Sequence, residues 1–157
     1  MFKVGEYAVC PGHGVGQICD IEERDMGAQK KAFYVLKVSS NGMTVMVPTD
    51  SEAGIRSLAN EEIIEQVFNL LADHNVKVDN STWNRRYREY MLKIKTGSLV
   101  EIADVLRALL LLKSKKNLSF GEKKMVDSCR DLLAQEIALS KGLAKQDIAK
   151  QIDSCFV

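Results

Sequence analysis

Residues 32–48 are AFYVLKVSSNGMTVMVP, two runs of apolar and β-branched residues on either side of Asn41-Gly42. Both residues of an Asn-Gly pair tolerate positive φ, so this pair is the strongest short signal for a β-hairpin. Pro48 has no N–H to donate to a neighbouring strand, so it ends its strand or marks a sheet edge. The stretch therefore predicts a hairpin whose second strand is open to a binding partner.

Two further strand-like runs, residues 7–10 and 14–21, precede the hairpin. Between them lies the glycine-rich PGHGVG, residues 11–16. In a nucleotide-binding site a helix would begin directly after such a glycine-rich loop. Here a strand-like run follows instead, so the stretch predicts a connection between two strands. Cys10 and Cys19 could face each other across this connection as small hydrophobic residues. Four or five short strands in fewer than 60 residues predict a small, strongly bent barrel or SH3-like sheet.

After residue 58 the apolar residues follow a helical period. Predicted helices begin after Asn60, Ser81/Thr82, Ser98 and Ser119, because such side chains cap helix N-termini. The last two are followed by glutamate at the third helical position, the capping-box pattern. Gly97 and Gly142 end two of the helices, residues 99–112 form an apolar central helix, and a short fifth spans about 144–155. The sequence thus predicts an α+β protein with domains 1–58, a small β barrel, and 59–157, a compact all-α bundle of about five helices.

Composition excludes several functional classes. No run approaches 18 apolar residues, and the start of the chain is charged too early for a signal peptide. The four cysteines are scattered without a CxxC pair, so we expect no metal site and reduced thiols in a cytoplasm. GxxxxGK[ST], HExxH and GxSxG motifs are absent, and there are only two histidines. We therefore expect neither an enzyme nor a cofactor, small-molecule substrate or membrane partner.

Charge is unevenly distributed along the chain. The formal net charge is +1, but residues 81–124 contain 11 basic and four acidic side chains, a net +7. A local positive field of this size attracts polyanions such as nucleic acids. The same residues would also suit the solvated face of a helix, and charge alone does not separate the two interpretations.

The most informative stretch is TWNRRYREYMLKIK, residues 82–95, which contains the only tryptophan. On a helix, Trp83, Tyr87 and Tyr90 fall within one arc with Met91 and Ile94, and most of the basic residues lie opposite. One interpretation is a buried aromatic stripe with a solvated basic back. The other is an aromatic ring among arginines that meets nucleic acid, because guanidinium groups contact phosphates and a planar ring stacks on or wedges between bases.

Several motifs together resemble one known family. They are FKVGEYAVCPGHGVGQI (2–18), FYVLKV (33–38), NGMTVMVP (41–48), TWNRRYREYMLKIKTGS (82–98), VLRALLLLK (105–113) and LSFGEKKM (118–125). In this order they resemble the CarD/CdnL family of bacterial transcription regulators, over nearly the whole chain. The N-terminal half is also similar to the polymerase-interacting domain of the transcription-repair coupling factor, but no Walker sequence of that ATPase motor is present.

The resemblance implies a Tudor-like domain that docks on the β subunit of RNA polymerase, and a helical domain that contacts promoter DNA. In the family a tryptophan wedges into the minor groove at the upstream edge of the bubble and stabilises the open complex; by position it is Trp83. DNA-contact positions match Arg85, Arg86 and Arg88, and more weakly Lys123 and Lys124. Polymerase-contact positions match Arg24, Met46 and Pro48, although some relatives have arginine in place of Met46. A monomer is expected.

Two other functional classes remain open from sequence. The first is an interaction scaffold without DNA contact, with Tyr7, Phe33 and Tyr34 forming a cage for a cationic ligand. The second is an enzyme that uses a reactive cysteine, although no histidine lies near any of the four except His13, in the glycine-rich connection beside Cys10.

Overall fold

The computed structural model describes residues 2–50, 54–78 and 81–156. The chain divides into two compact units, Met1–Leu58 and Ala59–Val157, of which the first is a sheet and the second a helical bundle.

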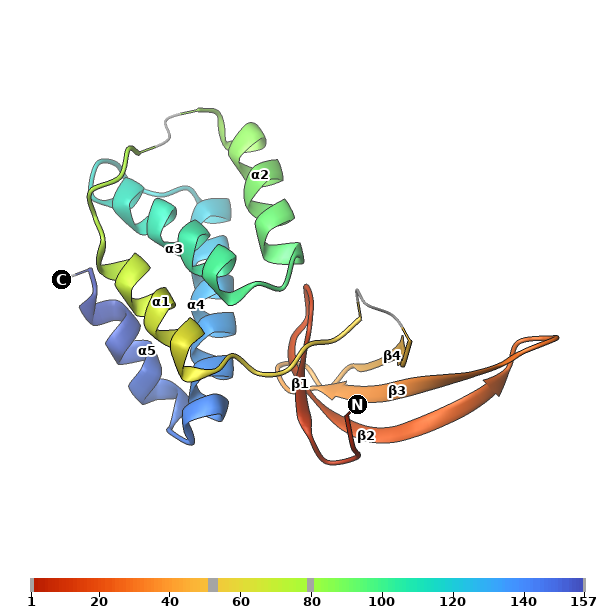
Figure 1. Ribbon diagram of the computed structural model, residues 1–157. Helices are drawn as coiled ribbons and strands as arrows, with labels where there is room; N and C mark the ends of the chain where they lie inside the picture. Colours follow the sequence, from red (N-terminus) through yellow and green to blue (C-terminus); the bar gives the residue numbers. More distant parts are fainter. Residues whose placement is uncertain (1, 51–53, 79–80, 157) are drawn as a thin grey trace. The chain divides into compact units, whose positions relative to one another are not determined.

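The first unit is a curled four-stranded antiparallel sheet with the order β1-β2-β3-β4, which confirms the predicted Tudor-like class (Figure 1). The strands are β1 (Tyr7–Cys10), β2 (Gly14–Asp25), β3 (Lys30–Val38) and β4 (Thr44–Pro48). Ala8, Ile18, Leu36 and Val47 form its core together with Tyr34. Tyr34 is 4% exposed and its hydroxyl accepts a hydrogen bond from the Phe2 N–H, so it is a core residue and not the wall of a cation cage.

Two connections match the predicted turn chemistry. Gly12 and Gly14 have positive φ in the β1–β2 turn, so the glycine-rich stretch is a strand connection. In the β3–β4 hairpin Gly42 also has positive φ, and the Asn41 side chain accepts a hydrogen bond from the Met43 N–H. Cys10 and Cys19 do not face each other as expected, because Cys10 is buried and Cys19 is exposed.

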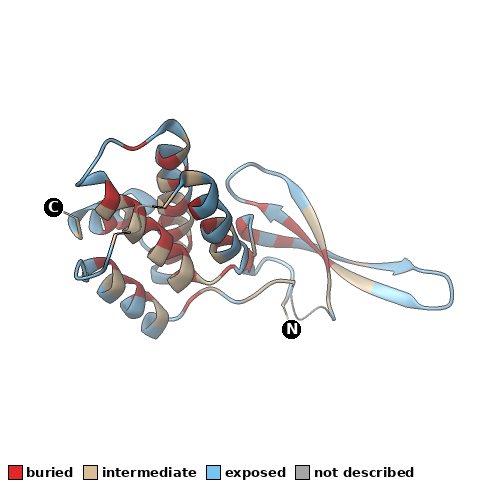
Figure 2. Ribbon diagram, turned by 90° about the horizontal axis from the view of Figure 1, so that it is seen from above, coloured by how far each residue is buried: buried red, intermediate tan, exposed pale blue. Residues whose placement is uncertain are grey.

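Strands β2 and β3 are longer than the sequence predicts. They continue beyond the sheet as a two-stranded ribbon, with Arg24 opposite Lys31 and Asp25 opposite Lys30. Figure 2 shows the far half of this ribbon mostly exposed. Both faces of a two-stranded ribbon meet water, so its residues lack the apolar alternation from which strands are predicted.

Among its described residues the second unit contains five helices, α1 (Glu61–Ala72), α2 (Trp83–Lys95), α3 (Leu99–Lys113), α4 (Phe120–Lys141) and α5 (Lys145–Ser154). The Asn60, Ser98 and Ser119 side chains accept hydrogen bonds from backbone N–H groups in the first turns of α1, α3 and α4. Gly142 ends α4 in the left-handed conformation. These caps confirm the predicted helix boundaries; Thr82 is the N-cap of α2 without a side-chain bond.

Helix α3 is the centre of the bundle, as its nearly continuous apolar sequence predicts. Seven of its residues are buried, and it packs against α1, α2 and α4. Among the described residues no helix is both long and apolar enough to cross a membrane.

Candidate nucleic-acid interface

Trp83 is the first residue of α2 and packs, partly buried, against the edge of the helical core. Its ring meets Tyr87 edge-on, with centroids 5.7 Å apart, and lies tilted to Tyr90 at 6.4 Å. Such pairs add to the stabilisation that burial alone provides. The indole is therefore held by its own helix at the N-terminal end, where part of the ring remains accessible.

The first turn of α4 lies directly against this ring. A Cβ atom built on Gly121 would be 3.1 Å from the indole Nε1, which is closer than nine in ten real contacts of this kind. Gly121 follows the Ser119 cap by two residues. The WNRRYREY and SFGEKKM stretches, separated by 28 residues in sequence, thus meet at Trp83.

Arg86 lies inside the bundle, although the family resemblance matches it to a DNA-contact position. It is 2% exposed, its Nη1 donates to the Glu122 Oε2 at 3.0 Å, and its Nε donates to the Ser81 carbonyl at 3.0 Å. Its guanidinium carbon also lies 5.2 Å from the centre of the Trp83 ring, a cation–π contact. Arg86 is thus buried against Glu122 and the Trp83 ring, unlike the other arginines of α2.

Glu122 anchors this arrangement from α4. It is 1% exposed, and it accepts hydrogen bonds from the Ser119 N–H at 2.9 Å and from Arg86. Burial by itself would raise the pKa of the carboxyl, but these donors outweigh it and lower the pKa from 4.5 to about 2. Glu122 is therefore ionised at neutral pH, and the same carboxylate closes the capping box of α4 and balances the buried Arg86.

The aromatic stripe of α2 faces the core as one interpretation predicts, except that Tyr87 turns outward and Arg86 turns inward. The buried residues are Arg86, Tyr90 and Ile94, whereas Tyr87 is 46% exposed. Arginine is rarely buried without a partner, so a pattern based on hydrophobicity assigns it to the solvent side.

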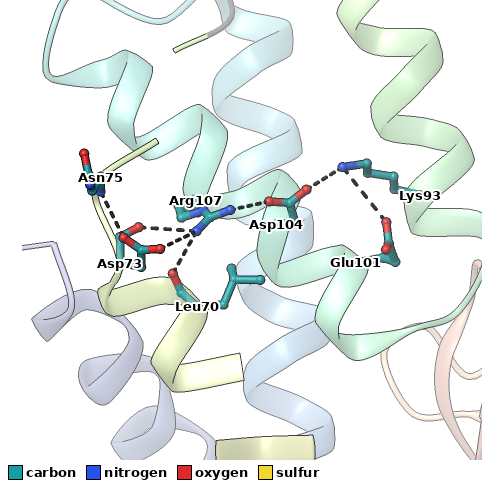
Figure 3. Close-up of polar contacts among 7 residues, drawn as sticks. All are labelled: Leu70, Asp73, Asn75, Lys93, Glu101, Asp104 and Arg107. Atoms are coloured by element: carbon teal, nitrogen blue, oxygen red, sulfur yellow. Dashed lines mark hydrogen bonds and ion pairs between the residues drawn. The ribbon is translucent and has the colours of Figure 1, made fainter. Parts of the chain in front are cut away.

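The C-terminal half of α2 is fixed by a second polar cluster, shown in Figure 3. Lys93 of α2 hydrogen-bonds Asp104 of α3 and lies 4.0 Å from Glu101. Asp104 in turn accepts a hydrogen bond from Arg107 at 2.7 Å, and Arg107 reaches the Leu70 carbonyl at the end of α1. The bond to Asp104 raises the pKa of Lys93, which keeps it charged. Helix α2 is thus held at both ends, through Arg86 and through Lys93.

The other basic residues predicted to contact DNA are exposed. Arg85 and Arg88 lie on α2, where Arg85 is 3.8 Å from Glu89 one turn later, and Lys123 and Lys124 lie in the first turns of α4. Because α2 and α4 meet at Trp83, these four cations and the partly exposed indole belong to neighbouring turns.

Sequence reasoning missed Phe120. It is 84% exposed at the first position of α4, between the Ser119 cap and Gly121. A usable signal was present, because a large aromatic directly after an N-cap lies outside the apolar period of its helix. The aromatic and basic residues of these two helix starts are the partly buried Trp83 and the exposed Arg85, Tyr87, Arg88, Phe120, Lys123 and Lys124.

Comparison with known proteins agrees with this architecture. A family model described as "CarD-like/TRCF RID domain" matches residues 2–59, and one described as "CarD, C-terminal domain" matches residues 66–153. The chain is 34% identical over 150 residues to "Putative transcription factor YdeB" of Bacillus subtilis (strain 168), covering 94% of this chain and 97% of that protein. The chain belongs to the CarD family.

In this CarD-family chain the strand register brings the residues predicted to contact polymerase to one face of the sheet. Arg24 pairs with Lys31, Met46 with Val35 and Pro48 with Phe33. Paired residues share a face, as do alternate residues along β3, so Arg24, Met46 and Pro48 lie on the face opposite Tyr34 and the β core. Arg24 is exposed, whereas Met46 and Pro48 are partly buried on β4, the edge strand.

Two of the four cysteines of the CarD-family chain, Cys10 and Cys129, are buried. Burial raises the pKa of the Cys129 thiol to about 12 and also raises the pKa of Cys10. Thiols with raised pKa are poor nucleophiles. In the described ranges no group of three His, Cys, Asp or Glu side chains is placed to hold a metal ion.

Proposed function

We propose that this protein is a transcription factor that docks on the β subunit of RNA polymerase and stabilises the open promoter complex, with Trp83 acting as a wedge in the minor groove. Membership of the CarD family supports the general part, a CarD-like transcription factor that interacts with polymerase. The DNA contact and its residues are the specific part of the proposal.

The observation that carries the DNA role is the setting of Trp83. A partly exposed indole is fixed between two helices whose neighbouring turns expose Arg85, Arg88, Lys123 and Lys124. Phosphate contacts by these cations would position the protein on the duplex without selecting a sequence. An apolar wedge set among them suits insertion between bases at a distorted step.

The expected energies fit a modulator of promoter opening. Stacking by one aromatic side chain contributes about 1–3 kcal/mol, which corresponds to roughly 5- to 150-fold in an equilibrium. Four phosphate contacts would give a slope of log K against log salt near −3.6, since each contributes about −0.9. Binding of this kind is weak in isolation and becomes effective when docking on polymerase raises the local concentration.

The polymerase contact is proposed for the face of the sheet opposite Tyr34. Arg24 supplies an exposed cation there, and Met46 and Pro48 supply apolar surface at the open edge strand β4. A partner strand could pair with this edge through its main chain. With methionine at position 46, the central contact is apolar.

The decisive experiment is the lifetime of the open complex on a promoter with an unstable bubble, with wild type, Trp83→Ala and Trp83→Phe. We expect the protein to lengthen the lifetime and Trp83→Ala to abolish most of that effect. Phenylalanine keeps part of the packing against Tyr87 and Tyr90 and should retain an intermediate effect. Phe120→Ala removes an 84% exposed ring and should weaken the effect without lowering the melting temperature.

Circular dichroism of each variant separates a DNA contact from a folding defect. If Trp83→Ala retains the wild-type melting temperature and the full lifetime, the ring is not a wedge. If the wild-type protein leaves the lifetime unchanged but binds polymerase, the DNA role fails and an interaction scaffold takes its place.

A further inference from the structure

We propose that Gly121 and Arg86 are positioning residues that fix the orientation of the Trp83 indole before it meets DNA. The inference rests on the DNA role proposed above and adds the means by which the wedge is oriented. Neither residue would itself contact DNA: each acts through the ring of Trp83.

Gly121 provides space for the indole. It lies in the first turn of α4 and is not among the glycines with positive φ, so its backbone does not require glycine. Alanine would favour the helix more strongly. A Cβ atom at this position would lie 3.1 Å from Nε1, 3.5 Å from Cε2 and 3.6 Å from Cζ2 of Trp83. The steric reason for glycine here is therefore the close approach of the ring.

Arg86 contacts the ring from its own helix. Its guanidinium carbon is 5.2 Å from the ring centre, and its orientation is fixed by bonds to the Ser81 carbonyl and to Glu122. The pair is nearly fully buried, with side chains 3% and 1% exposed, and a cation–π contact is stronger where the cation is desolvated. The α4 capping box thus reaches Trp83 through Glu122 and Arg86.

The consequence of this arrangement is preorganisation. Ordering a side chain on binding costs about 0.5–1.5 kcal/mol, or roughly two- to tenfold in affinity. A ring that is already held by Gly121, Arg86, Tyr87 and Tyr90 has lost that freedom before DNA arrives. A change that moves the ring without removing it should weaken the wedge while the bundle stays folded.

Gly121→Ala tests this directly, because Trp83 is the only tryptophan and its fluorescence reports on its own surroundings. We expect altered emission and altered quenching by acrylamide, an unchanged or higher melting temperature, and an open-complex lifetime shortened about two- to tenfold. Ser128→Ala, at an exposed position about two turns further along α4, is the matched control and should change none of these.

A double-mutant cycle shows whether Gly121 acts through the ring. In a Trp83→Ala background, Gly121→Ala should shorten the lifetime no further. Arg86→Lys is the second variant: it keeps a cation for Glu122 but loses the planar group over the indole, and it should shift the fluorescence and lifetime in the same direction.

The outcomes distinguish this inference from the function on which it rests. If Trp83→Ala shortens the lifetime while Gly121→Ala and Arg86→Lys leave fluorescence and lifetime unchanged, positioning is wrong and the wedge stands. If Gly121→Ala shortens the open-complex lifetime equally in the wild-type and Trp83→Ala backgrounds, the positioning role is also wrong. If Trp83→Ala itself has no effect, the proposed DNA role fails, and the positioning role fails with it.

Discussion

Replacing Glu122 with glutamine removes the charge that balances Arg86 while keeping the size of the side chain. Glutamine also serves at the third position of a capping box, so the start of α4 is preserved. The substitution leaves a guanidinium whose side chain is 3% exposed without its anionic partner, and it also removes the 3.5 Å ion pair of Glu122 with the half-exposed Lys116, which contributes little. Arginine does not give up its proton in a protein, so the buried cation cannot neutralise itself.

Two considerations give the size of the effect. Removing one partner of a buried ion pair costs about 3–5 kcal/mol. Independently, the pKa of Glu122 falls from 4.5 to about 2 on folding, which at about 1.4 kcal/mol per unit corresponds to about 3 kcal/mol. We expect the free energy of unfolding of the helical domain to fall by about 3 kcal/mol, a large part of the stability of an ordinary domain.

Urea unfolding followed by far-ultraviolet circular dichroism measures this change, because the helices dominate that signal. The matched control is the double variant Arg86→Met with Glu122→Gln, which removes the stranded cation and fills its place with a flexible apolar side chain. The double variant should regain much of the loss, since apolar replacement of a whole buried pair is often close to neutral.

A loss below about 1 kcal/mol for Glu122→Gln would refute the reasoning, because that is how an exposed pair behaves. Arg86 would then be free to contact phosphate. In that case Arg86→Met should make the slope of log K against log salt less steep by about 0.9 on promoter DNA.

Three further predictions concern Glu122, Arg88 and the residues of the sheet that are proposed to contact polymerase. Because the pKa of Glu122 is lowered on folding, its stabilisation should be complete above about pH 4.5 and lost as the pH falls toward 2; urea unfolding across this range should show a larger loss in wild type than in Glu122→Gln, which keeps the contribution of Asp104, whose pKa is also lowered. Arg88→Ala should leave the melting temperature unchanged and reduce the salt slope of binding to forked promoter DNA by about 0.9, measured by fluorescence anisotropy; an unchanged slope would remove Arg88 from the interface. Arg24→Glu and Met46→Asp should each weaken binding to the polymerase β subunit in calorimetry without unfolding the sheet, whereas Lys30→Glu, an exposed residue on the opposite face of β3, serves as the charge control.

Local patterns were sufficient for the type and order of the elements. Asn41-Gly42 predicted the β3–β4 hairpin, and Ser119 with Glu122 predicted the start of α4, because turns and caps are satisfied by residues close in sequence. The central place of α3 followed from its apolar sequence. The same reasoning ended β2 too early, since the exposed ribbon offers no apolar alternation to detect.

Only part of the candidate site could be predicted from the sequence. The stretch around Trp83 identified the helix that carries the site, and its motifs, with the others, indicated the family. Phe120 was missed because its exposure depends on the turn of α4 on which it lies, and the inward direction of Arg86 was missed because its partner lies on another helix. Each of these errors concerns the direction of a side chain and leaves the helix itself unaffected.

The sequence by itself determined the sheet and bundle, their order, and the stretch that contains Trp83, because these depend on short-range propensity and period. Only the tertiary structure decided which of the neighbouring arginines turns inward. An arginine faces solvent unless a buried anion compensates its charge, and the anion for Arg86 is Glu122, 36 residues away on another helix. That pairing arises when α2 packs against α4, so it is a property of the folded domain and not of either segment alone.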